Sequence, residues 1–203
     1  ESTVAIGHTR WATHGAPTDQ NSHPHVAERI AIVHNGIIEN HDQLRGELPG
    51  VEYRSETDSE VAAHLLRAEV ESGADLTTAM RAVVARLEGA FTLVAVDALD
   101  PDRIVAARRN SPLVVGVGDG EWFLASDVAA FIAYTRDAVE LGQDQIVELT
   151  RDGVTVTTFD GAPAETKAFH VDWDLEAAQK QGFDWFMRKE IFEQPHAVAD
   201  TLL

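Results

Sequence analysis

The feature of this sequence that most limits its fold is a series of seven short apolar segments between residues 90 and 159. They are Ala90–Asp97, Arg103–Arg108, Leu113–Gly118, Trp122–Ala125, Ala138–Leu141, Gln145–Thr150 and Val154–Phe159. Short turns such as Asp119-Gly120 separate most of them, and an expected helix over Asp127–Tyr134 interrupts the series. Connections this short favour antiparallel pairing, so the series predicts antiparallel sheets.

Two consecutive helices precede this series. Thr57–Ser72 has apolar residues at helical spacing and begins with a capping-box pair, Thr57 and Glu60. Leu76–Glu88 repeats the helical spacing and ends before Gly89. A strand-rich chain with two consecutive helices between its strands predicts a layered α+β domain.

The first part of the chain has two further apolar segments around a long polar loop. Thr3–His8 and Arg29–His34 each predict a buried strand, and Thr9–His25 predicts the loop between them. Arg29–His34 runs directly into Asn35-Gly36, the strongest short turn signal in the chain. We therefore expect a turn at this dipeptide.

The character of the sequence changes after about residue 162. Residues 162–166 are polar and linker-like, and Trp173–Gln181 and Phe186–Glu193 predict short helices. Pro195 is suited to begin another helix, where its missing N–H leaves no hydrogen bond unmade. The chain begins with Glu1 and stops inside an apolar helical pattern, so we expect both ends to be cut from a longer protein.

Composition narrows the classes of partner. With 16 basic and 34 acidic residues the formal net charge is −18, which disfavours nucleic acid and anionic membrane surfaces. The absence of cysteine excludes disulfides, thiolate metal sites and thiol nucleophiles within this chain. No apolar run approaches the roughly 20 residues that span a bilayer, and no signal peptide precedes the first segment. We expect a cytoplasmic protein.

Six of the nine histidines lie within the first 41 residues. They are His8, His14, His23, His25, His34 and His41. A metal site is disfavoured, because no HExxH motif, cysteine or tight set of carboxylates accompanies them. We expect no metal and no other cofactor, and loop histidines that bind backbone or substrate.

The polar loop after Thr3–His8 is the first candidate site. Arg10, Thr13 and His14 together can hold a carboxylate, because arginine offers a bidentate fork and the other two side chains add donors. The structural alternative is a loop in which Arg10 is merely paired, and the residues alone leave the two readings equal.

Two other short segments are ambiguous in the same way. Asn35-Gly36 is either a simple turn or an oxyanion hole, in which an amide N–H and a backbone N–H point at one developing negative oxygen. Asp58 opens a helix, where an acid is favourable in itself, and its functional alternative is to pair with a substrate ammonium. Local evidence favours the structural reading of both.

Four motifs in this order resemble the class II glutamine amidotransferases: HTRWATHG, NSHPH, VHNGIIEN and SETDSE. Trp11 and His14 match the hexosamine-forming branch, the glutamine:fructose-6-phosphate aminotransferases (isomerizing), better than the purine-pathway branch. The later stretches SPLVVGVG, ASDVAAF and KEIFEQP also match. The resemblance covers essentially all 203 residues.

The resemblance implies an α+β fold of the N-terminal-nucleophile hydrolase type, an αββα sandwich of two antiparallel sheets between helix layers. It implies that the first strand and helix, with the nucleophilic cysteine at the start of the mature chain, are missing here. Glu1 is no nucleophile, so we expect this chain alone to be inactive. It further implies that residues 1–182 are a glutaminase domain incomplete at its N-terminus, and that 183–203 are a linker and the start of a sugar-isomerase region.

The resemblance also assigns substrate-binding residues. Arg10, with Thr13 and His14, resembles the clamp on the glutamine α-carboxylate. Asp58 resembles the partner of the α-ammonium, helped by the backbone of Gly36. These roles match the functional alternatives left open above.

The remaining roles come from the same resemblance. Asn35 and Gly36 resemble the oxyanion hole, Trp11 resembles the aromatic gate of an internal ammonia channel, and His23 has a supporting position. The implied parent makes glucosamine 6-phosphate from fructose 6-phosphate and glutamine, binds the sugar in C-terminal isomerase domains of the same chain, and is a homodimer. The alternatives are the glutaminase domain of a purine-pathway amidotransferase and a nucleophile-less domain that binds glutamine.

Overall fold

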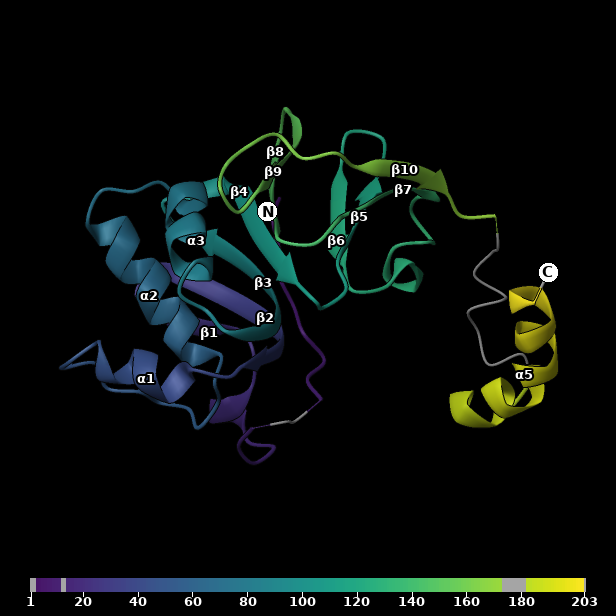
Figure 1. Cartoon of the computed structure of the whole chain (residues 1–203), viewed down its shortest axis with the longest axis horizontal. Helices are drawn as coiled ribbons and strands as arrows, with labels where there is room; N and C mark the ends of the chain where they lie inside the picture. The colour runs from purple at the N-terminus through teal and green to yellow at the C-terminus, as the bar shows by residue number, and fades with distance from the viewer. Residues whose placement is uncertain (1–2, 12–13, 173–181, 203) are drawn as a thin grey trace.

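Two antiparallel sheets form the frame of the protein (Figure 1), in a computed structural model that describes residues 3–11, 14–172 and 182–202. The six-stranded sheet has the order β1-β2-β3-β4-β8-β9. Its strands are β1 (His25–Ala27), β2 (Ile30–Ile38), β3 (Gly89–Asp97), β4 (Asp100–Arg109), β8 (Gln145–Thr150) and β9 (Gly153–Thr158). All neighbours in it pair antiparallel, as the short connections predict.

The four-stranded sheet has the order β10-β7-β5-β6. Its strands are β5 (Val114–Val117), β6 (Trp122–Ala125), β7 (Asp137–Glu140) and β10 (Lys167–His170). Every segment expected between residues 90 and 159 is therefore a strand, and the α+β prediction with antiparallel sheets is confirmed. The sequence did not reveal the short edge strands β1 and β10.

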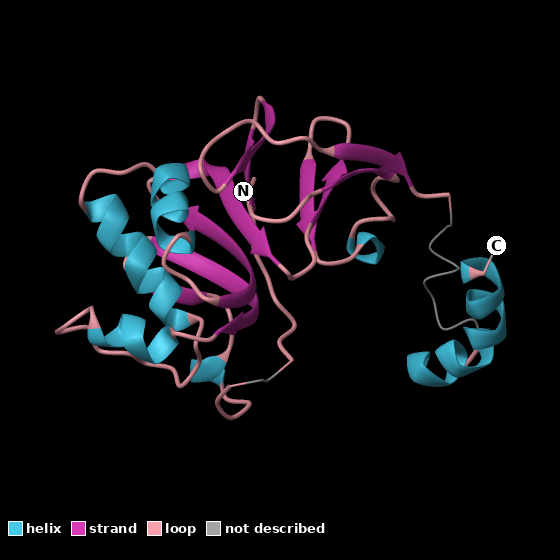
Figure 2. Cartoon of the chain, in the orientation of Figure 1, coloured by secondary structure: helices cyan, strands magenta, loops and turns pink. Residues whose placement is uncertain are grey.

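Helices cover one face of the six-stranded sheet (Figure 2). α2 (Glu60–Glu71) and α3 (Leu76–Val84) pack on each other and on the sheet, and α1 (His41–Gly46) packs against α2. Their apolar faces form one continuous core with the strands, in which Leu65, Met80 and Phe91 are completely buried. Each such side chain contributes roughly 1.5–3 kcal/mol by leaving water, so this layer fixes the sheet on which the polar residues stand.

The expected turn at Asn35-Gly36 does not exist. Both residues lie inside β2, opposite Thr92 and Phe91 of β3. Glycine is needed at this position for another reason: its φ is +135°, and a Cβ there would overlap the carbonyl oxygen of Ala90. Long-range pairing with β3 therefore overrides a local turn signal.

The start of α2 also differs from the prediction. The helix begins at Glu60, not at Thr57. Glu60 closes no capping box, because its carboxylate accepts hydrogen bonds from the backbone N–H groups of Arg54 and Ser55. Thr57 instead meets His25, with 3.1 Å between Oγ1 and Nε2. The segment before α2 is thus a bonded loop that presents Asp58 outside the helix.

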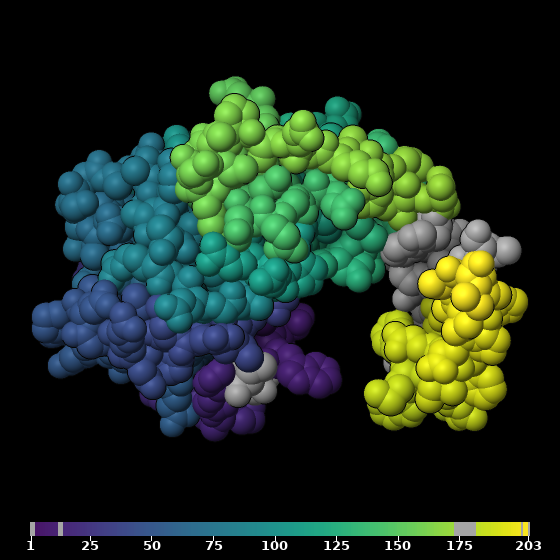
Figure 3. Space-filling model, in the orientation of Figure 1, coloured from purple at the N-terminus to yellow at the C-terminus, as the bar shows by residue number. Residues whose placement is uncertain are grey.

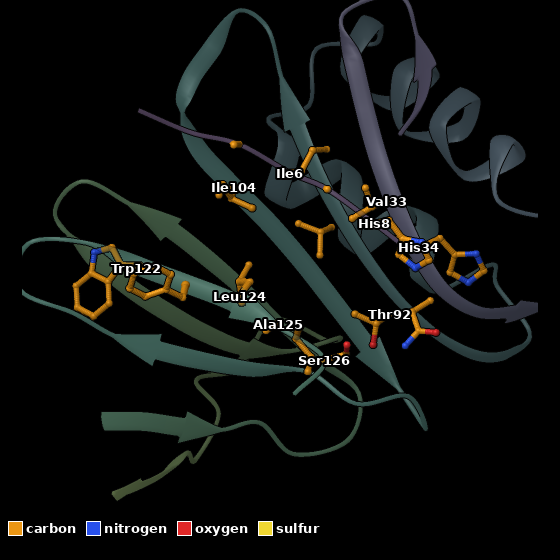
Figure 4. A pocket seen from close by; sticks show the side chains of 16 residues that line it. Ile6, His8, Val33, His34, Thr92, Ile104, Trp122, Leu124, Ala125 and Ser126 are labelled. Carbon is orange, nitrogen blue, oxygen red and sulfur yellow. The ribbon is translucent and has the colours of Figure 1, made fainter. Parts of the chain in front are cut away.

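Thr3–His8 is extended coil and not a strand. An apolar pattern alone does not supply a neighbouring strand, and none of the described sheets includes this segment. It lies between the two sheets, where Ile6 and His8 face a cavity of about 250 Å³ that Trp122 and Leu124 close from the four-stranded sheet (Figure 4).

The helices after residue 126 differ from those predicted. Only Val128–Ala130, a 3-10 turn, forms within the helix expected over Asp127–Tyr134. A single helix, α5 (Phe186–Thr201), contains Pro195 in its interior, so the expectation of a helix starting at this proline is wrong. The helix expected over Trp173–Gln181 lies outside the described residues. Figure 3 shows α5 at the opposite end of the molecule from α1–α3.

Candidate active site

One cavity of about 450 Å³ gathers the residues that the sequence singles out. Seven of the eight predicted site residues line it: Arg10, Trp11, His14, His23, Asn35, Gly36 and Asp58. The eighth, Thr13, lies outside the described residues. These seven residues come from three separate parts of the chain: the loop before β1, the middle of β2 and the segment before α2. The volume lies within the range of small-molecule sites.

Asp58 is the carboxylate among the residues that line this cavity. Its residue exposure is 3%, and its Oδ2 accepts a hydrogen bond of 2.7 Å from the backbone N–H of Ile38 in β2. The other oxygen, Oδ1, lies 4.0 Å from Nδ1 of His14. A buried carboxylate with one oxygen directed at a cavity suits a cationic ligand, because a buried charge needs a partner. The residue does not cap α2, whose N-cap is Ser59.

Asn35 stands on the same strand as the amide that holds Asp58. Its carbonyl oxygen accepts a hydrogen bond of 3.0 Å from Ser111 Oγ, which fixes the strand locally. Its side chain is exposed, and its amide makes no hydrogen bond within the described part of the chain. Its two N–H groups are therefore available to an oxygen atom bound in the cavity.

Arg10 is engaged with its own loop. Its Nη1 donates to the carbonyl of Ala16 and its Nη2 to that of His14, both at 2.9 Å, with a weaker contact of 3.3 Å to Gly15. The backbone of Arg10 has a φ of +49°, which is uncommon outside glycine. The structure thus brings Arg10 to the cavity and shows that its fork shapes the turn at His14–Ala16.

Trp11 and His23 differ in how far their side chains are exposed to solvent. The Trp11 side chain stands at the mouth of the cavity and is 92% exposed. His23 belongs to a row of packed imidazoles, with its ring centroid 4.3 Å from that of His8 and 4.8 Å from that of His25. Burial, and then the neighbouring His8, lower the pKa of His23 to about 3. His23 is thus a neutral wall of the site.

His34 is a site residue whose role the sequence did not indicate. It lies beside Asn35 on β2, and its Nδ1 lies 2.8 Å from Oγ of Ser59, the residue after Asp58. Burial lowers the pKa of His34 to about 4, although the carboxylate of Asp58 opposes this shift. The neutral imidazole therefore joins β2 to the start of α2. The motifs VHNGIIEN and SETDSE contain both partners, but not their contact.

These two histidines predict a pH-dependent stability. In the unfolded chain they take up protons near pH 6.5, whereas the folded chain takes them up only near pH 3 and pH 4. The unfolded state therefore binds more protons as the pH falls below 6.5. The free energy of unfolding should decrease there by up to about 1.4 kcal/mol per pH unit for each histidine.

Urea unfolding at about pH 7, 6 and 5 measures this slope, because most carboxylates titrate lower. His23→Asn should reduce the slope by up to about 1.4 kcal/mol per pH unit, the contribution of one proton. An unchanged slope would show that His23 takes up its proton at the same pH in the folded and the unfolded chain.

Comparison with known proteins identifies the domain. Residues 8–133 match the family described as glutamine amidotransferase domain, more than half of the chain. The chain belongs to this family. Its cavity residues from His8 to Ser126 all fall within the matched region of the amidotransferase domain.

Several curated relatives are glutamine--fructose-6-phosphate aminotransferases [isomerizing]. Identity is 69% to that of Streptomyces coelicolor, over 98% of this chain and 33% of the relative. It is 59% to that of Mycolicibacterium smegmatis (98% and 34%) and 59% to that of Corynebacterium diphtheriae (100% and 33%). The amidotransferase chain thus spans about a third of the length of these relatives.

Solved structures agree on the fold. Glutamine phosphoribosylpyrophosphate amidotransferase from B. subtilis has a TM-score of 0.61 at 23% identity, covering 75% of this chain and 34% of that one. A glutamine aminotransferase class-II domain protein from Silicibacter pomeroyi has a TM-score of 0.52 at 24% identity, covering 71% and 72%. The fold is that of the N-terminal-nucleophile hydrolase glutamine amidotransferases, as the resemblance implies. The phosphoribosylpyrophosphate amidotransferase shares this fold, but far less sequence with this chain than the aminotransferases do.

Within the described residues, no group of three or more His, Cys, Asp or Glu side chains is arranged to hold a metal ion. Of the helices in these same ranges, none has the length and apolarity to span a membrane.

Proposed function

We propose that this chain is the glutamine-hydrolysing domain of a glutamine:fructose-6-phosphate aminotransferase (isomerizing), which makes glucosamine 6-phosphate. The carrying observation is an identity of 57–69% to such enzymes over at least 98% of the chain. The cavity that collects the motif residues supports it. In this proposal residues 1–182 form the glutaminase domain and 183–203 lead to C-terminal sugar-isomerase domains of one cytoplasmic, homodimeric protein.

Glutamine would bind by the two charged groups on its α-carbon. Its α-ammonium would meet Oδ1 of Asp58, the carboxylate oxygen that points at the cavity. Its α-carboxylate would lie at the turn of Arg10 and His14, with Thr13 as the third donor. Such charge-assisted hydrogen bonds are stronger than neutral ones and fix the direction of the ligand. The side-chain amide then extends toward β2.

The reaction needs a nucleophile that these 203 residues do not contain, since they include no cysteine. A cysteine at the start of the mature chain would pass its thiol proton to its own α-amine, whose pKa of about 7.7–8.0 is close to that of a thiol, about 8.5. The thiolate would attack the side-chain amide carbon, ammonia would leave with a proton, and water would convert the thioester to glutamate and thiol.

Asn35 would act while the tetrahedral intermediate exists. Its side-chain N–H₂, with the backbone N–H of Gly36, would donate to the developing oxyanion. Removing one such donor costs about 3–4 kcal/mol in comparable sites. Trp11, exposed at the mouth, would gate the path of the released ammonia.

The assay is glutamate production from glutamine by the whole parent protein and by this chain. We expect the parent, given fructose 6-phosphate, to form glutamate and glucosamine 6-phosphate, and the chain alone to stay at the buffer level, because it has no cysteine. Glutamate release by the cysteine-free chain would refute the mechanism. A parent that binds glutamine without releasing glutamate would instead be a glutamine-binding protein.

A further inference from the structure

Asn21 is a buried polar residue that the mechanism above does not use. It ends the short 3-10 turn η1 (Asp19–Asn21) and is 2% exposed. Its Nδ2 donates to the carbonyl of Ala16 and to Oε2 of Glu56, both at 3.0 Å. Its Oδ1 accepts from the backbone N–H of Glu56 at 2.9 Å. The hydrogen bonds of its side chain therefore join the turn at Ala16 to the segment before α2.

Glu56 is the second half of this connection. Its Oε2 accepts from the backbone N–H of Ala16 at 3.3 Å in addition to the bond from Asn21. These two hydrogen bonds, that of Asn21 first, lower the pKa of the carboxyl group. Its own segment is firmly held, since the N–H and hydroxyl of Ser55 donate to Glu60 at 2.6 and 2.7 Å. Glu56 thus joins the turn to the hydrogen-bonded segment before α2.

The same segment before α2 carries Asp58, two residues after Glu56. His14 in the turn lies 4.0 Å from Asp58, between Nδ1 and Oδ1. The turn packs tightly against the segment before α2, because a Cβ on Gly15 would lie 2.7 Å from Nδ2 of Asn21. The Asn21–Glu56 pair therefore links the turn that carries His14 to the segment that carries Asp58. Neither member of the pair lines the cavity.

We propose that Asn21 and Glu56 are positioning residues that hold the His14–Ala16 turn against Asp58, and thereby set the affinity for glutamine. The inference rests on the proposed function, in which the turn binds the α-carboxylate and Asp58 binds the α-ammonium of one glutamine. The pair touches no reacting atom. When a binding-competent arrangement is only partly populated, the apparent dissociation constant rises in inverse proportion, while chemistry in the bound state is unchanged.

The test is steady-state glutaminase kinetics of the full parent protein with Glu56→Ala. If the competent arrangement falls to about one tenth, KM for glutamine rises about tenfold and kcat stays within about twofold. Glu56→Gln keeps an acceptor oxygen for Asn21 and Ala16, so it should recover most of the affinity. Glu52→Ala, in an exposed acid of the same loop, is the matched control and should leave both constants unchanged.

The outcomes separate the two proposals. A wild-type parent that neither hydrolyses nor binds glutamine in calorimetry overturns the proposed function and this inference with it. An active wild type whose Glu56→Ala variant keeps its KM overturns the inference alone, even if the variant melts at a lower temperature. A fall in kcat at unchanged KM also contradicts it, because the pair would then act on the chemistry.

Discussion

Replacing Gly36 by alanine is expected to lower the free energy of unfolding by more than about 3 kcal/mol, a large part of the total stability of a domain. The glycine has a φ of +135° in the middle of β2, a conformation that an L side chain rarely adopts. An added Cβ would also overlap the carbonyl oxygen of Ala90 and lie 2.8 Å from Cα of Phe91. Both neighbours are backbone of β3, so no side chain can move aside.

Urea unfolding of the chain measures the loss. Gly46→Ala is the matched control, because Gly46 ends α1 at a position where a Cβ would meet nothing within 4 Å. It should change the stability by no more than about 0.5 kcal/mol. A Gly36→Ala variant as stable as that control would mean that β2 and β3 separate more easily here than their register suggests.

Gly36 also shows where local sequence reasoning stops. The apolar segments between residues 90 and 159 were predictable, because most of these strands are joined to the next by a short turn that local residues specify. Asn35-Gly36 has the composition of a turn, yet β3 lies more than 50 residues away and supplies every pairing partner of this part of β2. A pairing between segments so far apart leaves no local signature, so the turn signal misled.

The site, too, could be predicted from the sequence only in part. The resemblance named residues that the structure gathers around one cavity, from three segments whose proximity no spacing could reveal. It did not indicate that the fork of Arg10 binds backbone carbonyls of its own loop, or that His34 contacts Ser59. Roles carried over from motifs concern the ligand. Contacts among the site residues themselves depend on the folded geometry, which motif letters do not contain.

Asp58→Asn in the full parent protein is expected to reduce kcat/KM for glutamine about a hundredfold. In the proposed function the buried carboxylate pairs with the α-ammonium, and removing one partner of a buried pair costs about 3 kcal/mol. Stability should change little, because asparagine keeps an oxygen that can accept from the N–H of Ile38. Asp119→Asn, in the exposed turn between β5 and β6, is the control for the loss of a charge.

A substrate analogue distinguishes recognition of the ammonium from a general defect. Glutaramic acid has the carboxylate and the amide of glutamine but lacks the amino group, so it offers Asp58 no charge to bind. Wild type should prefer glutamine strongly, and Asp58→Asn should lose most of this preference because only the glutamine reaction slows. If the variant slows both substrates equally and unfolds at lower urea, the bond from Ile38 N to Asp58 is what matters. Asp58 would then be a structural link between β2 and the segment before α2, and the ammonium would bind elsewhere in the cavity.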